Sequence, residues 1–158
     1  VSLEGKTIWL AQSLPVTPWQ VLRAKLSVQL ALTGVPALFC LLCAAISRMM
    51  TAGEWPAFAA LVLAGVLFQA LFALTLGTKM PNLTWTSELT PIKQSAPVAI
   101  SMLGGMFGSV ALAGLYFVFG AKIGFAGYAL IFTALLLAAS VLLYRWLKKK
   151  GSAIFAAL

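Results

Sequence analysis

Four apolar segments, each long enough to cross a lipid bilayer, occupy most of the chain, and none of them contains a charged residue. They run over about residues 26–47, 57–78, 96–120 and 123–144. The hydrocarbon layer of a bilayer takes about 20 helical residues to span. Because no water is available there to bind exposed peptide groups, helices are the economical way to cross it. We therefore expect an all-α, polytopic membrane protein whose four transmembrane helices form two antiparallel hairpins.

The composition and the charge distribution agree with this reading. Only 9% of the residues are charged, whereas soluble domains carry about 25%. The formal net charge of +8 could suggest nucleic acid, but the basic residues follow the loops. All 11 Lys and Arg except Arg48 and Lys122 fall before the first span, between the second and third, or after the fourth. The positive-inside rule then places both ends of the chain in the cytoplasm, and we expect no nucleic-acid partner.

Residues 1–25 form the most informative polar segment. An amphipathic helix is predicted from Glu4 to Leu14, and Pro15 ends it. A second helix is predicted to begin after Thr17, with Pro18 in its first turn, and to run directly into the first span. Two interpretations stay open: an interfacial helix anchored by its tryptophans at headgroup depth, or a cytoplasmic elbow that docks on a partner.

The first span contains a proline, Pro36, and a Cys-Leu-Leu-Cys sequence. The proline removes one helical hydrogen bond and predicts a kink. Cys40 and Cys43 could form a redox pair, but no charged neighbour lowers a thiol pKa there. We interpret them as small apolar residues. Two glutamines within the spans, Gln29 and Gln69, either join helices or contact a substrate, and we favour the first interpretation.

Small residues recur along the third span at helical spacing, which predicts a close contact with another helix. Whether that contact is internal or between subunits is not readable from the pattern. The residues of this predicted packing seam are Ser101, Gly104, Gly105, Gly108 and Ser109.

The sequence lacks the groups that catalysis usually requires. The only carboxylates are Glu4, Glu54 and Glu88, all outside the spans, and there is no His. General bases, metal ligands and a phosphate-binding loop are therefore missing. We expect no enzymatic activity, and any transport would draw its energy from an attached partner, since the spans offer no ionisable site for a coupling ion.

Two polar segments carry motifs at a distinctive spacing. The first reads Ser2-Leu3-Glu4-Gly5-Lys6, then Trp9, then Ser13-Leu14-Pro15-Val16-Thr17-Pro18, then Ala24-Lys25. It is similar to a cytoplasmic elbow of bacterial ATP-binding-cassette (ABC) exporter permeases, in which Gly is more usual than Ala24. In the second segment, Pro81, Trp85, Glu88, Pro91, Lys93, Gln94 and Ser95 resemble a signature of one branch of export permeases. The ending from Lys150 to Leu158 is similar to that branch as well.

The resemblance implies a permease subunit in the bacterial inner membrane, driven by a separate cytoplasmic ATPase that binds the ATP. No cofactor is then held by this chain. The elbow residues that would couple to the ATPase are Glu4, Lys6, Trp9, Ser13, Leu14, Pro15, Pro18 and Lys25. Because the chain begins with Val, we expect a single transmembrane domain, 1–158, from the C-terminal part of a longer permease. Further helices of that chain or a second copy would complete it. The alternative is a non-transporting assembly protein that works through helix packing.

Overall fold

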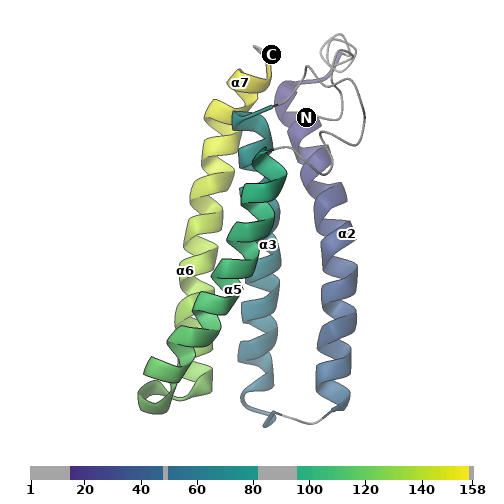
Figure 1. Cartoon of the computed structure of the whole chain (residues 1–158). Helices are drawn as coiled ribbons and strands as arrows, with labels where there is room; N and C mark the ends of the chain where they lie inside the picture. Colours follow the sequence, from purple (N-terminus) through teal and green to yellow (C-terminus); the bar gives the residue numbers. More distant parts are fainter. Residues whose placement is uncertain (1–14, 48–49, 82–95, 157–158) are drawn as a thin grey trace.

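The computed structural model describes residues 15–47, 50–81 and 96–156, and helices account for nearly all of them (Figure 1). The elements are α2 (Pro18–Ile46), α3 (Trp55–Lys79), α5 (Ala96–Ile123), α6 (Phe125–Trp146), the π-helical turn η2 (Leu147–Gly151) and the short α7 (Ser152–Ala156). Four helices are long and apolar enough to cross a membrane. The prediction of a four-span, all-α membrane protein is confirmed. The predicted helix 4–14 and residues 82–95 lie outside the described residues.

Helix α2 begins where the sequence predicted and does not stop at its proline. The Thr17 backbone N–H donates to Gln20 Oε1 at 2.7 Å, and the Gln20 N–H donates to Thr17 Oγ1 at 3.4 Å. This reciprocal capping box satisfies two N–H groups that the first turn leaves without helical partners. Pro18 stands in that first turn, and the helix continues through Pro36 to Ile46. Residues 18–25, the described helical part of the entry segment, are thus continuous with the first span.

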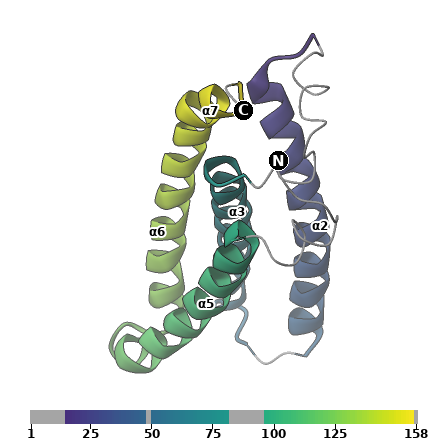
Figure 2. The same cartoon turned by 45° about the horizontal axis from the view of Figure 1, so that its top comes forward.

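Helix α3 is the centre of the bundle. It contacts α2, α5, α6, η2 and α7, and its contact with α6 is the most extensive. Figures 1 and 2 show α2 on one side of α3 and α6 on the other, with α5 crossing α3 obliquely. The α5–α6 hairpin turns through Gly124 alone, whose φ of 76° is readily adopted only by glycine. Two antiparallel hairpins result, and both described ends of the chain lie at the same end of the bundle.

The last span extends further than the apolar pattern indicated. Helical structure continues past Tyr144, through η2 and α7, to Ala156. Leu147, Gly151 and Phe155 are buried at intervals of four residues, so they form one inward stripe. Lys148, Lys149 and Lys150 interrupt the apolar run but point outward, which is why composition alone ends the span too early.

The C-terminal segment packs on the beginning of α2. Phe155 is 1% exposed and Leu22 is fully buried, and the two form a cluster with Trp19 around them. Lys25 Nζ lies 5.5 Å from the centroid of the Phe155 ring. The ring of Trp19 meets that of Tyr144 edge to face, with centroids 5.1 Å apart. The first and last spans are therefore joined at this end of the bundle, as Figure 2 shows for α7 and α2.

Replacing Phe155 by Ala tests this closure, the contact that joins the last span to the first. The substitution leaves a cavity beside Leu22, so we expect the free energy of unfolding to fall by about 3 kcal/mol. Titration of the protein with SDS in mixed micelles measures it. Phe117 is 84% exposed, so Phe117→Ala is the matched control and should change stability by less than about 0.5 kcal/mol. Equal losses in the two variants would contradict the closure.

A small hydrogen-bonded turn precedes α3 at the opposite end. Glu54 Oε2 accepts a bond from the Thr51 hydroxyl at 2.7 Å and one from the Thr51 backbone N–H at 3.2 Å. These bonds favour the charged carboxylate and hold the pKa of Glu54 below its ordinary value of 4.5. A lowered pKa means that the stabilisation is present above the unfolded-state pKa and is lost as pH falls through the folded-state pKa.

The Thr51→Val variant tests this assignment. It removes the hydroxyl donor and keeps the backbone N–H, so we expect the pKa of Glu54 to rise toward 4.5. Carbon NMR of the carboxyl group during an acid titration measures the value. Thr33→Val is the control, because the Thr33 hydroxyl donates only within α2, to the Gln29 carbonyl. An unchanged pKa in Thr51→Val would show that the hydroxyl bond does not form.

Candidate functional site

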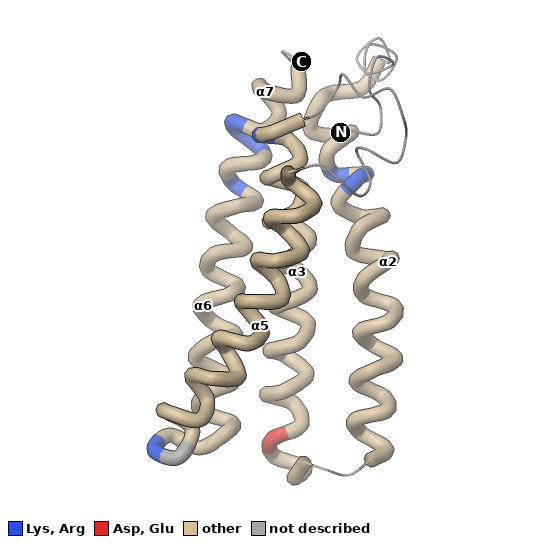
Figure 3. Tube along the Cα trace, viewed as in Figure 1, with Lys and Arg blue, Asp and Glu red and all other residues tan. Residues whose placement is uncertain are grey.

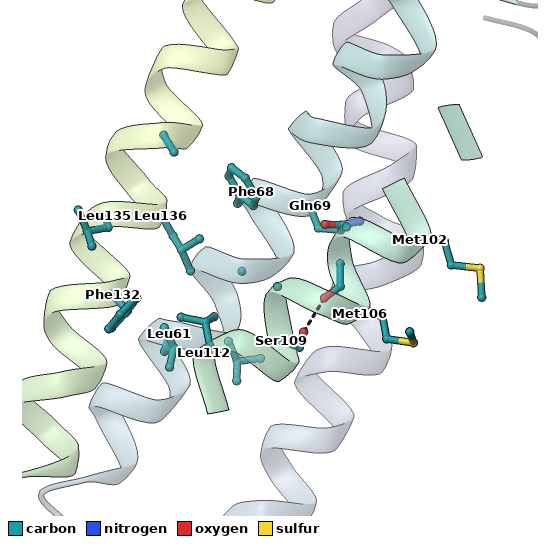
Figure 4. A pocket seen from close by; sticks show the side chains of 16 residues that line it. Leu61, Phe68, Gln69, Met102, Met106, Ser109, Leu112, Phe132, Leu135 and Leu136 are labelled. Atoms are coloured by element: carbon teal, nitrogen blue, oxygen red, sulfur yellow. Dashed lines mark hydrogen bonds between the residues drawn. The ribbon is translucent and has the colours of Figure 1, made fainter. Parts of the chain in front are cut away.

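A cavity of about 860 Å³ lies among α3, α5 and α6 (Figure 4). The α3 and α6 sides are formed mainly by large apolar residues, whereas α5 contributes several glycines and a serine. The lining residues are Leu61, Val62, Gly65, Phe68 and Gln69 from α3; Met102, Gly104, Gly105, Met106, Gly108, Ser109 and Leu112 from α5; and Phe132, Leu135, Leu136 and Ala139 from α6. All of them belong to the membrane-spanning parts of their helices.

At one end of the cavity, α5 approaches α3 closely because two glycines face it. The Gln69 Nε2 amide donates to the Ser101 carbonyl oxygen at 2.6 Å, a bond between the two helices. A Cβ atom built on Gly105 would lie 2.9 Å from Gln69 Nε2, and one on Gly104 would lie 3.3 Å from the Phe72 ring. A Cβ at Gly105 would thus displace the Gln69 amide, and one at Gly104 would crowd the Phe72 ring, so glycine permits the approach.

At the other end, near the Gly124 turn, aromatic rings join α5 to α6. The Tyr116 ring lies 5.4 Å from that of Tyr128 and 5.7 Å from that of Phe125, in edge-to-face arrangements. The Tyr128 hydroxyl donates to the Leu112 carbonyl oxygen at 2.6 Å. Phe58 of α3 joins the group, with its ring centroid 6.4 Å from that of Phe125. The cavity lies between this aromatic cluster and the close glycine contact.

The lining is apolar apart from two neutral polar side chains. The Ser109 hydroxyl donates to the Gly105 carbonyl oxygen of its own helix at 2.9 Å, the bond drawn as a dashed line in Figure 4. Gln69 uses one amide hydrogen on Ser101 and projects toward α5. None of the lining residues in the described part of the chain carries a charge. The chemistry that the cavity offers is therefore one amide and one hydroxyl in an apolar setting.

Three of the five seam residues predicted from the sequence lie at the contact with α3, and the other two lie at the open cavity. Gly104 and Gly105 face α3, and the carbonyl of Ser101 accepts the Gln69 bond. Gly108 has no atom within 4 Å of a built Cβ, and with Ser109 it lines the open cavity. The aromatic cluster was not identified from the sequence, since nothing in the spacing of Tyr116 and Tyr128 shows that a one-residue turn brings them together.

The other site residues predicted from the sequence either lie away from the cavity or fall outside the described residues. Gln29 is exposed on α2, and Cys40 and Cys43 are free thiols exposed on the same helix. The elbow residues within the described chain are Pro15, Pro18 and Lys25, and Pro81 is the described part of the second loop. Those outside it are Glu4, Lys6, Trp9, Ser13, Leu14, Trp85, Glu88, Pro91, Lys93 and Gln94.

The basic residues gather at one end of the bundle. Figure 3 shows them on α2 and at the end of α6, near both described termini. Lys79 belongs to the same end, where its Nζ lies 5.9 Å from the Trp146 ring centroid. Glu54, which precedes α3, and Lys122, in the last turn of α5, lie at the opposite end. The described chain thus has one strongly positive end, adjoining the predicted elbow, and one nearly neutral end.

No protein-family model, curated protein or solved structure that we compared with this chain matches it. Within residues 15–47, 50–81 and 96–156, no three His, Cys, Asp or Glu side chains come together as a metal site would require. What can be said of this multi-pass membrane protein therefore follows from its own geometry.

Replacing Gly105 by Leu tests the close contact between α3 and α5. The new side chain would displace Gln69 and break its bond to Ser101, so we expect a loss of stability of about 1–3 kcal/mol. Gly114 belongs to the same helix and has no atom within 4 Å of a built Cβ, so Gly114→Leu is the matched control. Unfolding by SDS in mixed micelles measures both. A Gly105→Leu variant as stable as Gly114→Leu would contradict the contact.

Proposed function

We propose that this protein is a transmembrane permease subunit of an ABC-type exporter, driven by a separate cytoplasmic ATPase. The observation that carries the proposal is the continuity of the entry segment with the first span. Helix α2 begins at the capped Thr17–Pro18 step and continues to Ile46 without a break. A force applied to the elbow would therefore act directly on a membrane-spanning helix.

The packing around the start of α2 supports this role. Trp19, Leu22 and Leu26 contact α6, α7 and α3 through their buried or half-buried side chains. Movement of the elbow would consequently reach the central helix and the last span together. Packed interfaces of this kind rearrange between discrete states rather than deforming continuously.

The energy source follows from the chemistry of the spans. Carriers driven by protons or ions keep an ionisable residue within the membrane. The apolar segments 26–47, 57–78, 96–120 and 123–144 contain no Asp, Glu, Lys, Arg or His. The proposal therefore assigns ATP binding and hydrolysis to the partner, and neither catalysis nor a cofactor to this chain. Further helices of a longer chain, or a second copy, would cover exposed apolar surface such as that of α2, where Leu32 and Phe39 are exposed.

The proposal includes an orientation. The positive end of the bundle, with both described termini, faces the cytoplasm of a bacterial cell, and Lys122 and Glu54 face outward across the inner membrane. The support is the positive-inside rule applied to the end where the basic residues gather.

Site-directed cross-linking tests the coupling. Val16 is 43% exposed beside the start of α2, and Ser47 caps the other end of the same helix. In a Cys40→Ser, Cys43→Ser background, we expect Val16→Cys to cross-link to a co-expressed ATPase encoded beside this gene. Ser47→Cys, on the opposite side of the membrane, should not cross-link. Absence of a Val16 adduct, or failure of the two proteins to co-purify, would overturn the proposal.

The same two variants test the orientation. A membrane-impermeant maleimide added to intact spheroplasts should label Ser47→Cys and leave Val16→Cys unlabelled until the membrane is opened. The reverse pattern would place the basic end outside and remove the elbow from reach of any cytoplasmic ATPase.

A non-transporting assembly role is the second candidate, favoured by the exposed apolar surface of α5. Phe107 and Phe117 of that helix, neither of which lines the cavity, are 63% and 84% exposed, as a face that binds further helices would be. Under this alternative, Gly105→Leu abolishes function, whereas substitutions at Pro15 or Pro18 do not. Under the permease proposal, the proline substitutions impair function by disturbing the elbow.

A further inference from the structure

We propose that the cavity among α3, α5 and α6 binds an uncharged, largely apolar small molecule that carries a single polar group and enters from the lipid. Regarding this molecule as the cargo rests on the proposed function, but the binding site itself does not. Four features of the cavity support the assignment: its size, its lining, its opening and its glycines.

The size suits a small molecule. Ligand cavities commonly measure about 300–1,000 Å³, and this one measures about 860 Å³.

The lining selects for a neutral molecule. With no charged residue among the lining groups, an ion would lose its hydration without gaining a partner. Gln69 retains its amide oxygen and a second N–H after bonding to Ser101, and the Ser109 oxygen can still accept. These groups suit one hydroxyl, carbonyl or amide. Met102 and Met106 supply flexible, polarisable surface that adapts to different apolar shapes.

The opening faces the membrane. Met102, Met106 and Leu135, on the rim, are 75%, 55% and 58% exposed, and all three belong to membrane-spanning segments. Exposed side chains at that depth meet acyl chains rather than water. A molecule dissolved in the bilayer can thus enter sideways, between α5 and α6.

Two glycines provide a selective way to fill the cavity. Gly65 of α3 and Gly108 of α5 both line it, and a Cβ built at either position meets no atom within 4 Å. A leucine there would occupy the space without pushing the helices apart. Gly114 is equally open but is not part of the lining, so it provides a matched control on the same helix as Gly108.

Photolabelling of the full chain in lipid nanodiscs tests the proposal, with an uncharged long-chain alcohol that carries a diazirine as the probe. We expect mass spectrometry to find adducts within residues 102–112 and 132–139, suppressed by excess unlabelled alcohol. Gly108→Leu should reduce these adducts at least about tenfold, which corresponds to about 1.4 kcal/mol of binding. Gly114→Leu should retain them. Should Gly108→Leu fail to fold, Gly65→Leu fills the same space from α3.

Several outcomes would overturn the site. One is equal labelling of Gly108→Leu and Gly114→Leu. A second uses a phospholipid probe with a diazirine in its acyl chain. If this probe labels the same residues and the free alcohol does not reduce the labelling, the cavity holds structural lipid. A third is equally strong labelling by a long-chain ammonium probe, which would contradict selection for neutral ligands. Because the assay needs no ATPase, it can succeed while cross-linking of Val16→Cys fails, and the reverse, so the two proposals fail separately.

Discussion

The contact on which the membrane part of this structure depends is the close approach of α5 to α3. Helices surrounded by lipid gain nothing from the hydrophobic effect when they associate, so tight packing and polar bonds must hold them together. Gly104 and Gly105 allow the approach, and the Gln69–Ser101 hydrogen bond joins the two helices at that point. Toward the Gly124 turn, the aromatic cluster around Tyr116 packs α5 against α6 instead. The cavity lies between these two contacts.

A second contact organises the basic end. The π-helical turn continues α6 so that Leu147, Gly151 and Phe155 share one buried stripe while the three lysines between them remain exposed. Through Phe155 and Tyr144 the last span adjoins Trp19 and Leu22 of the first. The segment that the proposed function couples to an ATPase is therefore joined to α6, one wall of the cavity. The two proposals concern the basic end and the middle of one packed assembly.

Local chemistry made some features predictable. The four spans follow from uninterrupted apolar runs. The start of α2 follows from Pro18 and from Thr17 and Gln20, and the two capping bonds between Thr17 and Gln20 form as expected. Features that depend on distant residues were not predictable. The helix beyond Tyr144 was missed because three lysines resemble a terminus, although they occupy its outer face. The cavity was missed because it requires the crossing of α5 over α3, which no periodicity specifies. The elbow and the second loop remain predictions.

The single-residue turn at Gly124 has a mechanical consequence. A longer connection would let α5 shift along its axis past α6, but one glycine leaves no slack for translation. The hairpin can instead pivot about Gly124, next to the Tyr116–Tyr128 contact. Such a pivot changes the distance between the two helices at the ends far from Gly124. It preserves which residues face each other near the turn.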